Sequence, residues 1–164
     1  MLLWFAGMSV VIVWNVFRSP ALDYRLVMLG AVLPVGEVAL GGPRLTHTLL
    51  FAVALLCAVM LATRRRRLLR RRLISLPIGI LMHLVLDGVW AVADVFWWPA
   101  FGWEFADGPL PELDRPLGVI VLLDLVGLAA LVWCWRAFGF SDRRRLDGFL
   151  RTGHLPRDLV GEGG

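Results

Sequence analysis

The sequence predicts an all-α fold, a polytopic membrane helix bundle with about five membrane segments, the second short or kinked. Hydrophobic residues make up 59% of the 164 residues, whereas a soluble domain is closer to half apolar. The apolar residues are grouped in blocks, as in helical membrane proteins. Two arginine runs follow closely on apolar blocks, which is typical of the loops between membrane helices.

The first three segments follow from apolar length and helix breakers. We interpret Leu2–Phe17 as a retained membrane helix, because no basic region precedes it as in a signal peptide. The second segment, Tyr24–Leu40, contains Pro34 and Gly36 and is short for a span, so a kinked or re-entrant helix is expected. The third segment, Leu45–Ala62, ends at an arginine run.

The last two segments complete the predicted domain. Leu73–Trp98 is expected to form one long helix, and Leu117–Trp135 forms the fifth segment. Residues 1–140 are therefore predicted to be a single transmembrane helical domain, and residues 141–164 a polar cytoplasmic tail. This tail forms either a loose terminus or a short amphipathic helix on the membrane surface. The apolar residues of that helix would be Phe149, Leu150 and Leu155.

The arginines also predict the orientation of the bundle. Seven arginines lie between Arg64 and Arg72, and three more lie at Arg143–Arg145. Such runs can bind nucleic acid or anionic lipid. Here they directly follow apolar segments, so we interpret them as cytoplasmic topology signals and expect the lipid bilayer, not nucleic acid, as the partner. The resulting protein is multi-pass, with its N-terminus outside and its C-terminus cytoplasmic. The acidic loop and the aromatic cluster around residues 96–116 then lie at the outer face.

Ionisable side chains within the predicted spans are the candidates for a functional site. Each costs roughly 3 kcal/mol or more in lipid, so such groups usually face inward and pair. His83 and Asp87 are four residues apart and share one helix face, and Asp94 would extend their stripe. The six candidates, from four segments, are Glu37, His47, His83, Asp87, Asp94 and Asp124.

These groups indicate a divalent metal ion. Acids without a nearby cation in the membrane repel one another, and a bound ion removes that repulsion. Imidazole and carboxylate together suit zinc or manganese. Simpler roles remain open for each residue: hydrogen bonding between helices for the two aspartates Asp94 and Asp124 and for the pair His83 and Asp87, capping of a helix start for His47, and a wet loop for Glu37.

Four short motifs resemble those of a known family. They occur in order between residues 21 and 103 and are Leu33-Pro34, Arg44-Leu45-Thr46-His47-Thr48-Leu49, the run from Gly79 to Asp87, and Trp97-Trp98-Pro99. Together they resemble the YdjM-like group of small bacterial inner-membrane proteins, in which a metal-dependent hydrolase activity is inferred. The stretches around Asp23 and Trp97 are similar to an actinobacterial-type subgroup.

The resemblance implies a site and a location. His47, His83 and Asp87 match the metal ligands of the group, and the plasma (inner) membrane of a bacterium is the expected location. Where the group has two acids after the Leu-Pro pair, this chain has Val35 and Glu37. The lead into Thr-His is also altered, to Gly42-Pro43-Arg44.

Three classes of function remain open. The first is a membrane-embedded hydrolase opening to the outer face and acting on a phosphoester or lipid-linked substrate. In it, Glu37 or Asp124 is a further ligand or the general base, and Arg44 holds a phosphate. The second, motivated by Val35, is a non-catalytic scaffold or partner subunit with a vestigial site. The third is ion or proton transport along the ionisable groups. A bundle of this size also leaves room for a homodimer.

Overall fold

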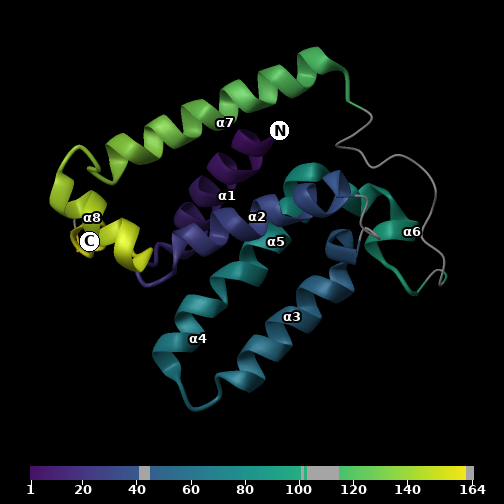
Figure 1. Cartoon of the computed structure of the whole chain (residues 1–164), viewed down its shortest axis with the longest axis horizontal. Helices are drawn as coiled ribbons and strands as arrows, with labels where there is room; N and C mark the ends of the chain where they lie inside the picture. Colours follow the sequence, from purple (N-terminus) through teal and green to yellow (C-terminus); the bar gives the residue numbers. More distant parts are fainter. Residues whose placement is uncertain (41–44, 101, 103–114, 162–164) are drawn as a thin grey trace.

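The fold is known from a computed structural model, which describes residues 1–40, 45–100, 102 and 115–161 (Figure 1). The described residues form helices, turns and loops and contain no strand, so the predicted all-α class is confirmed. The main helices are α1 (Leu2–Phe17), α2 (Tyr24–Ala39), α3 (Leu49–Ala62), α4 (Arg67–Leu73), α5 (Ser75–Asp87), α7 (Leu117–Ala137) and α8 (Arg143–Thr152). The shorter ones are η1 (Leu45–His47), η2 (Val89–Ala91), α6 (Ala93–Phe96) and α9 (Asp158–Gly161).

Two helix pairs organise the bundle. α2 packs along α5, and α1 packs along α7, while contacts between α1 and α2 join the pairs. α3 lies against the outer side of α5, and α4 leads from the α3 end back into α5 (Figure 1). The chain thereby brings the start of α3 and the end of α5 to the same region of the molecule, which is where the candidate site lies.

Glycines allow the close approach within both pairs. In the first pair, a Cβ atom on Gly79 would lie 2.9 Å from the Cα atom of Gly30 and would also overlap the Val27 carbonyl. In the second pair, a Cβ on Gly7 would overlap the carbonyl oxygen of Gly127. Small residues let helix backbones approach in this way, which is common in membrane helix pairs.

The predicted fourth segment is not one continuous helix. α5 ends at Asp87, because Gly88 adopts a left-handed conformation (φ 78°), a frequent helix C-cap for which glycine is the best residue. A 3-10 turn and the short helix α6 follow. The expectation that Asp94 continues the His83–Asp87 stripe is therefore wrong, and Asp94 is exposed on α6.

The C-terminal segment packs onto the bundle. α8 ends at Thr152 and is capped by Gly153, and Leu155 is buried in the core formed by α1, α2 and the end of α7. The backbone N–H of Leu155 donates to the carbonyl of Pro20, and that of Tyr24 donates to Gly153. An amphipathic helix was one of the two expectations for this segment, and α8 is that helix. The expected placement of Leu155 on the membrane surface is wrong, because its side chain is buried in the core.

Asp23 connects the link between α1 and α2 to α4 directly, and to α8 through Arg25. Its buried carboxylate caps α2 by accepting the backbone N–H groups of Arg25 and Leu26. It also pairs with the Arg25 guanidinium at 2.9 Å and with Arg72 at 3.0 Å, and Arg25 in turn donates to the carbonyl of Leu150 on α8. The α1–α2 link, the end of α4 and the last turn of α8 thus meet around Asp23.

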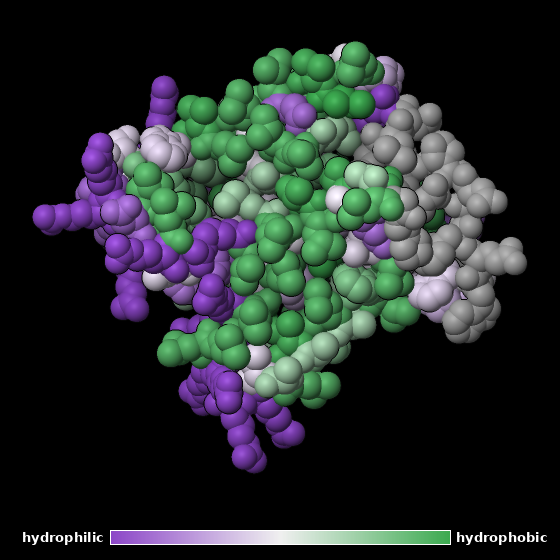
Figure 2. Space-filling model, in the orientation of Figure 1, coloured by the Kyte–Doolittle hydropathy of each residue, from purple (hydrophilic) through white to green (hydrophobic). Residues whose placement is uncertain are grey.

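The surface indicates association with a membrane. Among the described residues, one helix, α7, is long and apolar enough to cross a bilayer, and only 11% of its most apolar window is buried. α1 and α3 are apolar but shorter. Figure 2 shows apolar residues across much of one face, with hydrophilic residues at the margins over α8 and the α3–α4 turn. Large exposed apolar surfaces mark contact with a membrane or a partner protein.

Candidate metal site

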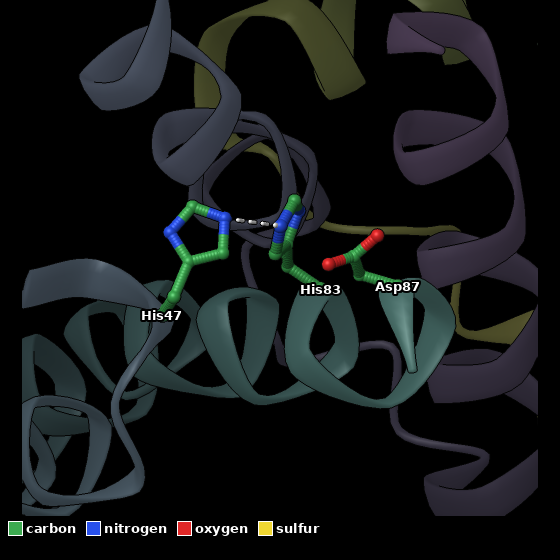
Figure 3. A group of neighbouring side chains, drawn as sticks. All are labelled: His47, His83 and Asp87. Carbon is green, nitrogen blue, oxygen red and sulfur yellow. Dashed lines mark hydrogen bonds between the residues drawn. The ribbon is translucent and has the colours of Figure 1, made fainter. Parts of the chain in front are cut away.

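Three of the predicted residues meet inside the bundle. Ligand atoms of His47, His83 and Asp87 lie within 4.8 Å of one another. Figure 3 shows His83 and Asp87 on successive turns of α5, pointing to the same side, with the His47 ring approaching from the segment before α3. The two histidines are fully buried and Asp87 is 1% exposed. This group could hold a metal ion, as the sequence predicted.

The close packing of α2 and α5 positions His83. One turn after Gly79, the His83 Nδ1 atom lies 2.8 Å from the carbonyl oxygen of Ala31 on α2. Since a carbonyl can only accept, Nδ1 carries the hydrogen and the Nε2 atom of the neutral ring keeps its lone pair. Phe5 of α1 covers the ring, with centroids 4.1 Å apart. The imidazole is therefore held in one orientation and one tautomer.

Glu37 positions the segment that carries His47. Its carboxylate oxygens accept the backbone N–H groups of Leu45 and Thr46, each at 2.9 Å, and the Thr46 hydroxyl. A carboxylate at the start of a helical turn satisfies N–H groups that would otherwise lack a partner. Thr48 then caps α3 by accepting the N–H of Phe51. His47 lies between these two caps, so both of its neighbours in sequence are fixed.

Asp87 lies beside a cation that the sequence analysis did not anticipate. An Arg115 guanidinium nitrogen lies 3.4 Å from the Asp87 Oδ1 atom and donates to its backbone carbonyl at 2.6 Å. The assumption that no cation lies near the acids is therefore wrong for Asp87. An arginine partner stabilises the ionised carboxylate, which is the form that binds metal. It also supplies part of the positive charge that was attributed to an ion alone.

The histidine geometry fits a tetrahedral ion. The two Nε2 atoms are 3.3 Å apart (Figure 3). Two nitrogens that each lie about 2.05 Å from one tetrahedral zinc ion are themselves about 3.3 Å apart. Metal-binding histidines usually donate their other ring N–H to a carbonyl or carboxylate, as His83 does to Ala31. Three protein ligands leave a fourth position open, which is typical of catalytic zinc sites.

The other predicted site residues lie outside the three-residue group. Asp124, on α7, accepts the backbone N–H of Trp4 at 3.1 Å, so it contacts α1. Glu37 holds the η1 segment, as described above. Arg44, together with Gly42 and Pro43, lies outside the described residues, as do Phe101, Trp103 and most of the acidic loop. The catalytic roles of Glu37 and Asp124 and the phosphate role of Arg44 stay predictions.

Sequence reasoning missed three contributors to the site. Arg115 carried a weak signal, because it is the one cation in an otherwise acidic stretch. The Ala31 carbonyl and the Phe5 ring carried none, since any residue has a carbonyl and apolar residues are common in such a chain. Their roles depend on which helices touch.

Comparison with known proteins adds no assignment. The fold and the site define an all-helical protein that carries a buried His-His-Asp group. No family model, curated protein or solved structure matches the chain.

Proposed function

We propose that the chain is a membrane-embedded, metal-dependent hydrolase that uses His47, His83 and Asp87 to bind one divalent ion. The observation that carries this proposal is the 3.3 Å separation of the two Nε2 atoms, with His83 Nδ1 occupied by the Ala31 carbonyl. The Ala31 contact leaves Nε2 as the His83 ring nitrogen that faces Nε2 of His47, and one ion could bind between these two atoms. The likeness of the Thr-His and His-x-x-x-Asp motifs to the YdjM-like group supports the same assignment.

The mixed ligand set favours zinc or manganese, because imidazole suits zinc and carboxylate also suits manganese. An ion bound here supplies a Lewis acid that activates water and stabilises developing negative charge. The residues of the chain position the ligands: Ala31 fixes the His83 tautomer, Glu37 fixes the His47 segment, and Arg115 contacts both the carboxylate and the backbone carbonyl of Asp87. A phosphoester or lipid-linked substrate agrees with a site in a membrane-associated bundle, and the location we propose is a bacterial inner membrane.

A second candidate function is a closed structural metal site in a non-catalytic scaffold. The complete burial of both histidines and the pairing of Asp87 with Arg115 favour it, because structural sites are closed to solvent whereas catalytic sites keep an open position. In this case the ion would hold the start of α3 against α5, and its removal would lower stability without removing an activity.

The deciding experiment compares metal content in purified wild type and in a His83→Ala, Asp87→Ala double variant. We expect about one equivalent of zinc or manganese in the wild type and none in the variant, because too few ligands remain. A matched control, His154→Ala with Asp94→Ala, removes the same residue types away from the group and should keep the ion. Absence of metal in wild type after loading with divalent ions would overturn the proposal.

Activity separates the two candidates. A hydrolase should cleave a chromogenic phosphodiester, and cleavage should disappear in the double variant and with a chelator, while the control variant stays active. An ion that binds in full but supports no hydrolysis, and whose removal lowers the melting temperature, would establish the structural site instead.

A further inference from the structure

We propose that the chain binds the phosphate headgroup of an anionic phospholipid in a basic cavity between α4 and the C-terminal segment. The cavity holds about 490 Å³, which is within the usual range of ligand sites. Its polar lining comes from two stretches far apart in sequence and consists of Arg71, Arg72, His154 and Arg157. We call it the arginine pocket. It is remote from the His-His-Asp group and does not depend on the proposed hydrolase function.

The charges in the arginine pocket are available to a ligand. Arg72 uses its Nε atom to pair with Asp23, which leaves its terminal nitrogens for other contacts. Arg71 and Arg157 pair with no carboxylate among the described residues. No acidic residue of the described chain lines the cavity. Guanidinium groups bind phosphate through paired hydrogen bonds, so a cavity of this composition suits a phosphate.

An adjoining cavity indicates a lipid as the source of the phosphate. It holds about 340 Å³ and shares Ala21 and Arg71 with the arginine pocket; the rest of its lining is Ser19 and the apolar side chains of Phe17, Leu22, Ile74 and Ile78. A free phosphate would leave this apolar trough unused, whereas a phospholipid would place its headgroup among the arginines and the start of a chain along the trough. Basic pockets between membrane helices bind lipid headgroups in this way.

The topology signal alone does not account for this arrangement. A run of arginines that only sets orientation can point freely into solvent. Here the docking of Leu155 into the core and its bond to the Pro20 carbonyl bring His154 and Arg157 against α4. The C-terminal segment thereby forms one wall of the pocket, and both arginine-bearing segments can contact one ligand.

The test uses the full-length protein in a non-ionic detergent, with binding measured by calorimetry. The probes are short-chain phosphatidic acid, short-chain phosphatidylcholine and inorganic phosphate. We expect phosphatidic acid to bind at least about tenfold more tightly than the other two, since only it offers both an anionic headgroup and a chain. Equal binding of phosphatidylcholine would overturn the charge argument, and equal binding of inorganic phosphate would overturn the lipid.

Two variants of equal charge locate the site. Arg71→Gln with Arg157→Gln removes the two unpaired arginines of the pocket and should weaken phosphatidic acid binding by about tenfold or more. Arg64→Gln with Arg65→Gln makes the same change in net charge outside the pocket and should leave the affinity nearly unchanged. All four side chains are exposed, so both variants should fold. Equal losses in the two variants would show diffuse attraction and overturn the proposal.

Discussion

Single residues connect the parts of this molecule through charge and hydrogen bonds. Glu37 accepts hydrogen bonds from the segment that carries His47, and Arg115 pairs with Asp87. Away from this site, Asp23 pairs with Arg72 and so connects the α1–α2 link to α4. Burial alone raises the pKa of Asp23, but its hydrogen bonds and ion pairing with Arg25, the N–H of Leu26 and Arg72 outweigh it, so the pKa is lowered overall. The ionised carboxylate therefore stabilises the folded state.

Replacing Asp23 tests this role. Asn still caps a helix, so Asp23→Asn removes mainly the charged contacts and should cost about 2 kcal/mol of stability near neutral pH. Asp23→Ala also loses the cap and should cost about 1 kcal/mol more. Thermal unfolding in detergent, followed by circular dichroism, measures both. Asp142→Asn is the matched control, because Asp142 caps α8 through the N–H of Arg144 and the described structure gives it no arginine side-chain partner.

The same carboxylate sets a pH dependence. Because its folded-state pKa is depressed, its stabilisation is present above the ordinary value of 3.8 and is lost as the pH falls through the folded-state pKa. The gap in melting temperature between wild type and Asp23→Asn should therefore narrow below about pH 4. A gap that stays constant into strong acid would contradict the role of the charge.

At the scale of helices, the approach of α2 and α5 decides whether the site forms. Gly30 and Gly79 let the two backbones meet, and one turn beyond Gly79 this contact brings His83 to the Ala31 carbonyl. Pro34 withdraws one N–H from the hydrogen bonds of α2. The predicted second segment, Tyr24–Leu40, is observed as the helix α2 (Tyr24–Ala39). This helix contains Pro34 and supports the site.

Two alanine substitutions on α2 isolate the packing effect. In Gly30→Ala the new Cβ would overlap the Leu76 carbonyl, so the helices must separate, at a cost of about 1–3 kcal/mol. The contact between His83 and Ala31 should loosen with them and metal affinity should fall. At Gly36 nothing lies within 4 Å of an added Cβ, so Gly36→Ala should be neutral or stabilise the helix by up to about 1 kcal/mol. Thermal unfolding and metal titration of the two variants measure these differences. Equal losses of stability and of metal affinity in both variants would contradict the packing argument.

At the scale of the whole molecule, apolar surface and arginines are separated. α7 and α3 expose many large apolar residues, and the hydrophilic residues lie at the margins of the face in Figure 2, over α8 and over the α3–α4 turn. Among the described helices, α7 alone is long and apolar enough to cross a bilayer. The multi-pass hypothesis therefore depends on whether the shorter helices also lie in the bilayer.

Cysteine labelling tests that part. Cys57 lies exposed on α3, whereas Cys134 is buried. In a Cys134→Ala background, if α3 faces lipid, a water-soluble maleimide should not react with Cys57 in intact membranes but should react after denaturation. A Cys57→Ala, Arg64→Cys variant in the same background should react in permeabilised membranes, because it places the thiol in the turn between α3 and α4. Fast labelling of Cys57 in membranes would put α3 in water and contradict its role as a membrane segment.

The sequence alone determined the local features of this protein. The apolar blocks predicted the all-α class, and the four-residue spacing predicted that His83 and Asp87 share a face, because helical periodicity is a local property. Gly88 is a typical residue at a helix end, but the apolar run continues past it, so one long helix over Leu73–Trp98 was expected. The tertiary structure decided the rest: it brought His47 to His83, set Arg115 beside Asp87, and placed Asp124 against α1. These outcomes depend on which distant segments pack together, and packing at Gly30 and Gly79 is a property of both helices at once.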